Sequence, residues 1–255
     1  MKKRQTIYYT SFADDVVTSK NQNMQLPKDY EWVRKGLVEK IKYKVWYSVI
    51  FIVATFYTKC ILHIKVRNRK VLKESKNTGY FVYANHTQPT GDAFAPAWIC
   101  RGKRINTIVS PANLGIPVLG RILPYVGALP IPGDIKGMKL FTEAIETRVK
   151  QKQAIIIYPE AHVWPYYTKI RPFPATSFRY PVEQNAPVFC MTTTYQKRHI
   201  SQKPKITIYI DGPFVSNASQ SRKEQRELLC EEIYTCMCRR SENSNYSYYE
   251  YVKGE

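Results

Sequence analysis

The chain has 255 residues, of which 44% are hydrophobic, and it carries 39 Lys and Arg residues against 20 Asp and Glu. A chain of this length can bury a large core, and its ordinary apolar content excludes a polytopic membrane protein. The formal net charge of +19 predicts an anionic partner, such as nucleic acid, an acidic membrane surface or phosphorylated substrates.

The six cysteines indicate reduced, mostly buried thiols in a cytosolic compartment, because they form no Cys-x-x-Cys pair and have no His at ligand spacing. Cys230, Cys236 and Cys238 lie in a helical pattern, which is more typical of packing than of a metal site, and no metal is expected. Polar residues follow the charged start of the chain, so the sequence predicts no secretory signal.

The amino-terminal third divides into two segments. Residues 1–26 are polar and predict a loosely structured arm, and a helix is expected to begin near Pro27. Within the helical segment 27–60, the apolar run Val45–Thr58 is shorter than the roughly 20 residues that span a bilayer. Lys and Arg flank both ends of the run. These features favour an amphipathic or apolar helix lying in one leaflet against anionic headgroups; a buried core helix and a spanning helix are the alternatives.

The next stretch places a His and a carboxylate on one loop. Tyr80–Ala84 reads as a buried strand, and Asn85 and His86 follow where that strand ends. Thr87–Gly91 has turn chemistry, and Asp92 precedes an apolar run whose helix it is expected to cap. Sites in α/β sheets form at the carboxyl ends of strands. A carboxylate beside an imidazole fixes its tautomer and stabilises the imidazolium; the alternative is a surface His and an Asp that only caps.

The remaining elements alternate between strands and helices. Strands are expected at 61–71, 105–110, 154–158, 186–195 and 205–210, the last of them at a sheet edge. Helices are expected from Asp92 to about 101, from Asp134 to about Lys152, and from Ser219 or Ser221 to about Arg240. This alternation predicts an α/β fold with a mixed central sheet flanked by helices over residues 61–240. A polar, Tyr-rich tail at 241–255 is expected to be frayed.

Short motifs in this order resemble those of the glycerolipid acyltransferase superfamily, the 1-acylglycerol-3-phosphate acyltransferases and their relatives. Asn85-His86 with Asp92 resembles the first motif, although five residues separate His and Asp here and four do so in the family. Residues 113–131 resemble the second motif. Gly127 fits that motif, but Gly133 stands where the family has an Arg that contacts the acceptor's phosphate.

The third motif of the family, Phe-Pro-Glu-Gly-Thr-Arg-Ser, is similar to the stretch that begins Tyr158-Pro159-Glu160. In the family its Glu binds the acceptor. Ile170-Arg171-Pro-Phe resembles the Lys-Pro-Phe segment that follows, which implies an anion-binding role for Arg171. Pro187 and its apolar neighbours resemble the weak fourth motif.

The resemblance implies a catalytic domain over 61–240 that moves a fatty acyl chain from an acyl thioester to a lysophosphatidate-like hydroxyl in phospholipid biosynthesis. His86 is implied as general base and Asp92 as the residue that orients it. Substrate-binding roles are implied for Asn85, Gly127, Pro159, Glu160 and Arg171. No bound cofactor is expected, and acyl-CoA or acyl-carrier protein is the co-substrate. Direct attack is expected, because no Ser or Cys lies beside the His.

The expected location is the cytoplasmic face of a membrane, as a peripheral or monotopic protein on an anionic surface. Two alternatives remain open at this point. One is a catalytically silent or different-acceptor membrane-bound relative, consistent with the longer His-Asp loop and the missing Arg. The other is a basic nucleic-acid-binding protein; nucleic acid is not the expected partner, because no zinc ligands and no RNA-recognition signature are visible.

Overall fold

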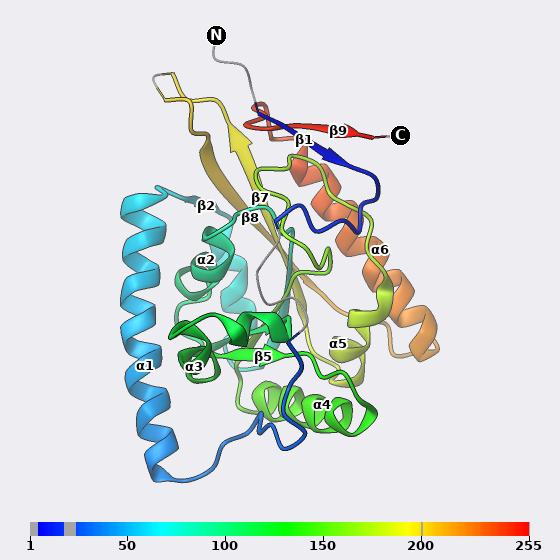
Figure 1. Ribbon diagram of the computed structural model, residues 1–255. Coiled ribbons are helices and arrows are strands. Elements are labelled where there is room, and N and C mark those ends of the chain that lie inside the picture. Colours follow the sequence, from blue (N-terminus) through cyan, green and yellow to red (C-terminus); the bar gives the residue numbers. More distant parts are fainter. Residues whose placement is uncertain (1–4, 18–23, 200, 255) are drawn as a thin grey trace.

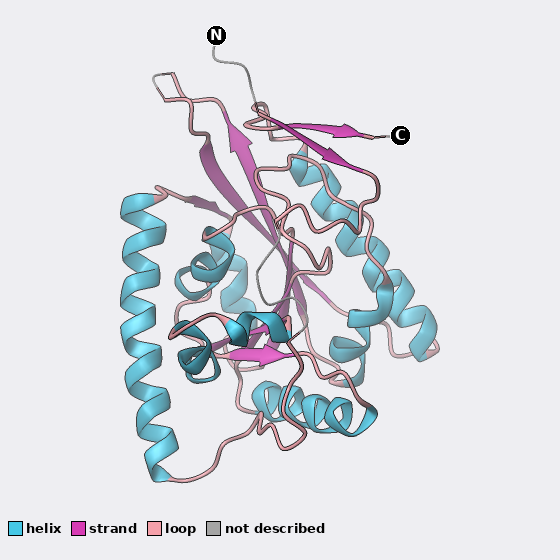
Figure 2. Ribbon diagram, in the orientation of Figure 1, coloured by secondary structure: helices cyan, strands magenta, loops and turns pink. Residues whose placement is uncertain are grey.

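The computed structural model describes residues 5–17, 24–199 and 201–254. These residues form a seven-stranded sheet in the order β2-β8-β7-β3-β6-β4-β5, with helices on both faces (Figures 1 and 2). Its strands are β2 (Lys65–Arg67), β3 (Tyr80–Ala84), β4 (Ile105–Val109), β5 (Ala128–Pro130), β6 (Ala154–Ile157), β7 (Val188–Gln196) and β8 (Lys205–Phe214). Strands β7, β3, β6, β4 and β5 run parallel, and β8 is antiparallel to β7. The sheet is therefore mixed, as the sequence predicted.

The α-helices of the described chain are α1 (Leu37–Phe56), α2 (Gly91–Ile99), α3 (Leu119–Ile122), α4 (Ile135–Lys150), α5 (Arg179–Glu183) and α6 (Arg222–Ser241). Shorter helical turns are η1 (Tyr57–Ile61), η2 (Arg69–Ser75), η3 (Pro111–Gly115), η4 (Leu123–Val126) and η5 (Ala175–Phe178). All five residues of β3 are buried, and they alternate between two cores. Phe81 and Tyr83 pack on the α4 and α6 side, and Val82 packs on the α1 and α2 side.

Two helices begin where the sequence predicted. Asp134 caps α4 by accepting a hydrogen bond from the Gly137 N–H at 2.8 Å. Ser221 caps α6 in a reciprocal capping box with Glu224, which satisfies two amide donors that the first turn otherwise leaves free. In α4, Phe141 and Ile145 lie four residues apart, on one face of the helix, and both are buried in the core.

The segment before α1 differs from the prediction of a helix beginning near Pro27. Helix α1 begins only at Leu37, after Gly36, whose φ of 105° no helical residue adopts. Residues 24–36 form turns and loop instead. Trp32 is 8% exposed, and its indole N–H donates to the Pro130 carbonyl at 2.9 Å. The stretch before α1 is thus attached to the core through the Trp32 side chain and does not form the expected helix.

The predictions of a loose arm and a frayed tail were wrong for residues 6–9 and 250–253. Strand β1 (Thr6–Tyr9) pairs in parallel with β9 (Glu250–Lys253), at the top of Figure 1. Tyr rings hold this small sheet to the domain: Tyr9 and Tyr251 both pack on Trp164, with ring centroids 4.7 and 5.2 Å apart. The polar composition of these two segments predicted disorder. The packing of Tyr9 and Tyr251 on Trp164 instead holds them in an ordered sheet.

Two further strand predictions need correction. The strand expected over 61–71 shrinks to β2, because Asn68 adopts a left-handed conformation and η2 follows. Strand β8 is not an edge strand, since β2 pairs with it from Lys65 to Arg67. The last residue of the expected tail, 255, lies outside the described residues, as do 1–4 and 18–23 of the expected arm.

Within the described residues, one helix, Leu37–Ile61, is long and apolar enough to cross a membrane by length and composition. It includes α1 and η1 and is longer than the apolar run of 14 residues seen in the sequence. One side of α1 packs on the domain through Tyr43, Tyr47 and Ala54, and the other side is exposed.

Candidate active site

The loop that follows β3 is anchored to the neighbouring strand by Asn85. The Asn85 side chain is buried, donates to the Thr193 carbonyl at 3.1 Å and accepts from the Thr193 N–H at 2.7 Å. The amide nitrogen and the amide oxygen of Asn85 are therefore both hydrogen-bonded to the backbone of β7. The sequence implied that Asn85 binds substrate, whereas the structure places it inside the protein, where it fixes the backbone from which His86 projects.

His86 and Asp92 lie side by side. The His86 Nδ1 is 2.8 Å from the Asp92 Oδ2, and the two side chains are 24% and 7% exposed. Asp92 is in the first turn of α2 and does not cap it, because Thr90 holds the cap position. The same Asp92 oxygen accepts from the Gln88 N–H at 2.9 Å. The loop therefore brings His86 and Asp92 into contact, although five residues separate them in the sequence and four do so in the family.

Tyr158 contacts both members of this pair, and no role was predicted for it from the sequence. Its ring stacks on His86, with centroids 4.4 Å apart and planes 27° apart. Its hydroxyl donates to the Asp92 carbonyl at 2.7 Å. An aromatic residue at the carboxyl end of β6, next to β3 in the sheet, was the signal that could have identified it.

The electrostatics of the pair follow from its enclosure. Burial raises the pKa of Asp92, whereas the hydrogen bonds from His86 and the Gln88 N–H act to lower it. Assigned from this hydrogen bond, His86 carries its proton on Nδ1 and donates it to the carboxylate. In the described part of the chain no residue hydrogen-bonds Nε2, so Nε2 is the nitrogen that can accept a proton.

Glu160 follows β6, the strand next to β3, and reaches the same loop. Its Oε2 accepts from the His86 N–H at 3.0 Å, and its Oε1 accepts from the Arg171 N–H at 2.9 Å. The Arg171 guanidinium lies 3.1 Å from Oε2, and both side chains are fully buried. Burial raises the pKa of Glu160, and Arg171 opposes that shift. Pro159, half-buried, precedes Glu160 in the same turn.

The structure places Arg171 in the interior, whereas the sequence implied contact with a substrate anion. Besides Glu160, its guanidinium donates to the carbonyls of Phe12 and His162 and lies 4.7 Å from the centre of the Trp164 ring. Glu160 and Arg171 thus face each other and hold the His86 loop. The sequence identified both residues but not their pairing.

The terminal sheet covers the far side of this loop. The Trp164 N–H donates to the His86 carbonyl at 2.9 Å, and the indole N–H donates to the Asp14 carbonyl at 2.9 Å. Tyr251 stacks on the same indole with planes only 3° apart. Residues from both terminal segments therefore hold the backbone of the site in place.

Gly127 is not brought to His86. It has a φ of 97°, and an added Cβ would collide with the Ile105 carbonyl oxygen, so only glycine fits. Gly127 precedes β5 and lies level with the start of β4. It is therefore at the amino ends of the parallel strands, whereas His86 is at their carboxyl ends. Gly127 borders a cavity at the amino ends of the strands, and its left-handed conformation allows a tight backbone turn there.

Among the described residues, no group of three or more His, Cys, Asp or Glu side chains is arranged to hold a metal ion. The six cysteines are free thiols.

Neither a scan against protein-family models nor a search of curated proteins finds a match. A search of solved structures finds the 1-acyl-sn-glycerophosphate (LPA) acyltransferase PlsC from Thermotoga maritima, with a TM-score of 0.57. The two chains are 15% identical, and the match covers 84% of this chain and 86% of PlsC. The chain thus has the PlsC fold over most of its length, which confirms the predicted fold class.

Proposed function

We propose that this chain is an acyltransferase of the glycerolipid acyltransferase superfamily, which moves a fatty acyl chain from a thioester to a lysophospholipid hydroxyl. The observation that carries the proposal is the 2.8 Å contact between His86 and Asp92 on a loop at the carboxyl end of a strand, in a chain with the PlsC fold. The order of the motifs in the sequence supports the same assignment.

In the proposed reaction, His86 acts as general base through Nε2. It removes the proton of the acceptor hydroxyl while the hydroxyl oxygen attacks the thioester carbonyl. Asp92 stabilises the imidazolium that forms. When the tetrahedral intermediate collapses, the carbon–sulfur bond breaks, and the imidazolium returns the proton to the departing thiolate. The products are an ester and a free thiol, and His86 and Asp92 regain their starting states.

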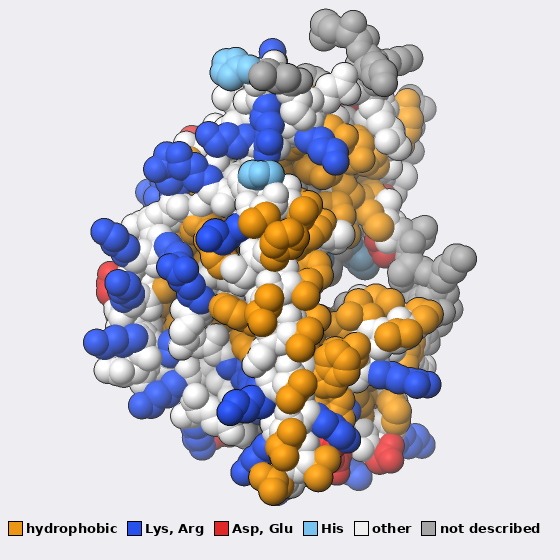
Figure 3. Space-filling model, turned by 90° about the vertical axis from the view of Figure 1, so that its left-hand side faces the viewer, with side chains coloured by type: hydrophobic (Ala, Val, Ile, Leu, Met, Phe, Trp, Pro, Cys, Tyr) orange, Lys and Arg blue, Asp and Glu red, His pale blue; other side chains and the backbone are white. Residues whose placement is uncertain are grey.

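Helix α1 supports a membrane-surface location for this reaction. Its outward face exposes a row of apolar side chains, here called the α1 stripe: Leu37, Val38, Ile41, Val45, Val49, Ile52, Val53 and Phe56. Figure 3 shows these hydrophobic side chains as a vertical band with Lys and Arg beside it. Because the other face of α1 packs on the domain, the helix lies alongside the protein, which favours insertion into one leaflet over spanning. We propose attachment to the cytoplasmic face of an anionic membrane.

We propose acyl-CoA or acyl-carrier protein as donor and a lysophosphatidate-like lipid as acceptor. One observation favours a different acceptor as the second candidate. Gly133 stands where the family's phosphate-binding Arg would be, and no atom lies within 4 Å of the place that a Cβ would occupy there. A headgroup phosphate bound at that position would have no cation supplied by residue 133.

The assignment is tested by incubating the purified protein with labelled palmitoyl-CoA or palmitoyl-carrier protein and each of four acceptors. These are lysophosphatidate and the choline, ethanolamine and glycerol lysophospholipids. The expected result is a labelled two-chain lipid from at least one pair, with no label left on the denatured protein. No product from any pair would contradict acyl transfer to lysophospholipids, and label held on the protein would contradict direct attack.

The α1 stripe gives a separate prediction. The variant Ile41→Ser/Ile52→Ser is expected to bind anionic vesicles about 30-fold more weakly, because each exposed Ile contributes roughly 1 kcal/mol when it enters the bilayer interface. Cosedimentation with vesicles of phosphatidylcholine and phosphatidylglycerol measures the change. The matched control is Val215→Ser/Leu228→Ser, which removes two exposed apolar side chains outside α1. Equal losses in both variants would show that α1 is not the membrane-binding element.

A further inference from the structure

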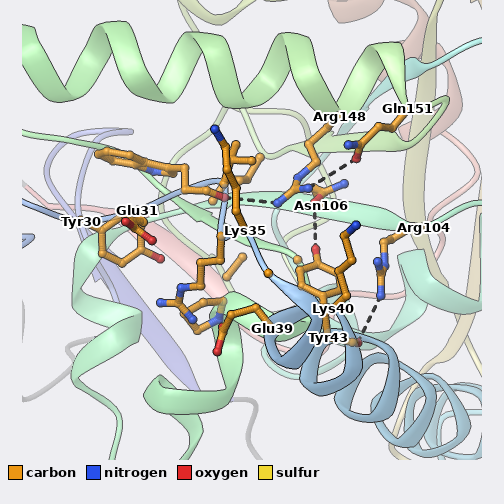
Figure 4. A pocket seen from close by; sticks show the side chains of 18 residues that line it. Tyr30, Glu31, Lys35, Glu39, Lys40, Tyr43, Arg104, Asn106, Arg148 and Gln151 are labelled. Atoms are coloured by element: carbon orange, nitrogen blue, oxygen red, sulfur yellow. Dashed lines mark hydrogen bonds between the residues drawn. The ribbon is translucent and has the colours of Figure 1, made fainter.

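A cavity lies at the amino ends of the sheet strands, whereas the His86 loop lies at their carboxyl ends. It encloses about 550 Å³, a volume typical of small-molecule sites. Its walls come from residues 30–36, the first turns of α1, the starts of β4 and β5, and the end of α4, as Figure 4 shows. The proposed acyl transfer needs none of these residues. We call this hollow the amino-edge cavity.

The amino-edge cavity is strongly cationic. Five basic side chains line it: Arg34, Lys35, Lys40, Arg104 and Arg148. Two carboxylates, Glu31 and Glu39, also line it, and Lys42 already engages Glu39 at 2.9 Å. Within the described residues, none of the five cations forms an ion pair within 4 Å. The hydrogen bond from Lys42 lowers the pKa of the Glu39 carboxyl, and the charge of Arg34 adds to that effect from a greater distance. An excess of unneutralised positive charge inside a concave wall attracts anions.

Two of these cations, Arg104 and Arg148, are held in place by groups that do not neutralise them. The Arg104 and Arg148 guanidiniums lie 3.6 and 5.6 Å from the centre of the same Tyr43 ring. Arg104 donates to the Tyr43 carbonyl at 3.1 Å, and Arg148 donates to the Trp32 carbonyl at 3.2 Å. Burial and the neighbouring Arg148 both lower the pKa of Arg104. Two fixed like charges around one ring repel each other, and a bound anion would relieve that repulsion.

The floor of the cavity is polar as well. Asn106 is fully buried there, and its amide nitrogen donates to the Gln153 side chain at 2.8 Å. Figure 4 shows Tyr43 joined by hydrogen bonds to both Asn106 and Arg104, with Lys40 next to it on α1. Preplaced guanidinium groups are well suited to phosphate oxygens, because they present several N–H donors in one plane.

We propose that the amino-edge cavity binds a phosphate group, separately from the proposed acyl-transfer site. Two sources can supply that phosphate: the headgroup of an anionic lipid or a soluble phosphorylated compound. Helix α1 contributes Lys40 and Tyr43 to the cavity and Ile41 and Val45 to the α1 stripe. The cavity therefore adjoins the surface proposed to lie on the membrane.

The test compares two double variants of the full chain that each remove two positive charges. Lys35→Gln/Arg148→Gln acts in the cavity, and Lys136→Gln/Lys139→Gln acts on exposed residues of α4 that do not line it. Binding of inorganic phosphate is measured by titration calorimetry. Binding to phosphatidylcholine vesicles with one-fifth phosphatidate is measured by cosedimentation, with phosphatidylserine vesicles of equal surface charge as reference. Circular dichroism checks that both variants are folded.

A lipid source is shown if wild type prefers phosphatidate over phosphatidylserine vesicles, the cavity variant loses that preference at least fivefold, and inorganic phosphate does not compete. A soluble source is shown if inorganic phosphate binds with a heat that the cavity variant lacks and the α4 variant keeps. The proposal is overturned if wild type shows neither a phosphatidate preference nor phosphate binding. Equal losses in both variants also overturn it, because they indicate diffuse attraction to the +19 charge.

Discussion

Replacing His86 by Ala is expected to lower kcat for acyl transfer by about 10²–10⁴-fold, the range that a general base contributes. The reason is that Nε2 of His86 is the proposed proton acceptor for the reacting hydroxyl, and Asp92 and Tyr158 both contact that ring. Asp92→Asn is expected to lower kcat as well. An amide can keep a contact with the ring, but it cannot stabilise the imidazolium by charge.

The measurement is a steady-state assay with the donor and acceptor pair that gives product. His162→Ala is the matched control, because His162 is another partly exposed His on the adjoining loop, with its ring near Asp15 at 3.6 Å and not near Asp92. It is expected to keep wild-type kcat. Thermal unfolding of all three variants separates loss of chemistry from loss of fold. Unchanged kcat in His86→Ala would remove His86 as the base.

Arg171→Met is expected to reduce the free energy of unfolding by about 3–5 kcal/mol, the usual effect of removing one member of a buried ion pair. The change leaves the Glu160 carboxylate enclosed without a cation and removes the donors to the Phe12 and His162 carbonyls. For a chain of this size, such a loss lowers Tm by about 6–20 °C. Activity should fall with it, since Glu160 also accepts the His86 N–H.

Lys139→Met is the control, since this exposed residue on α4 should change stability by no more than about 0.5 kcal/mol. The double variant Arg171→Met/Glu160→Gln is expected to be more stable than Arg171→Met alone, because the enclosed charge is gone. Calorimetric melting and urea denaturation measure all three. A wild-type midpoint in Arg171→Met would show that the buried pair does not stabilise this fold.

Local signals in the sequence were enough to place much of the sheet and its helices. Strand β3 is a run of five apolar or aromatic residues. The neighbouring strands β6 and β7 were likewise predicted from apolar runs in the sequence. Helices α4 and α6 are marked by Asp134 and Ser221, whose side chains act on amides three residues away. Such signals need no knowledge of distant residues, and the His86 and Asp92 pair also lies within one short loop.

The features that the sequence did not predict depend on residues far apart in the chain. Nothing near Thr6 indicates that it lies opposite Glu250, and Trp32 reaches a carbonyl at position 130. Glu160 and Arg171 are eleven residues apart in irregular backbone, where no periodicity indicates that they pair. The family resemblance implied contact with substrate for these residues, and the structure shows both of them buried, with Glu160 hydrogen-bonded to the His86 N–H.

The small terminal sheet ties the two ends of the described chain to the His86 loop. Tyr251 in β9 stacks on Trp164, whose backbone N–H donates to the His86 carbonyl, and β9 pairs in parallel with β1. A cut or crosslink that pulled β9 away from β1 would therefore uncover the Trp164 ring and loosen the backbone next to His86.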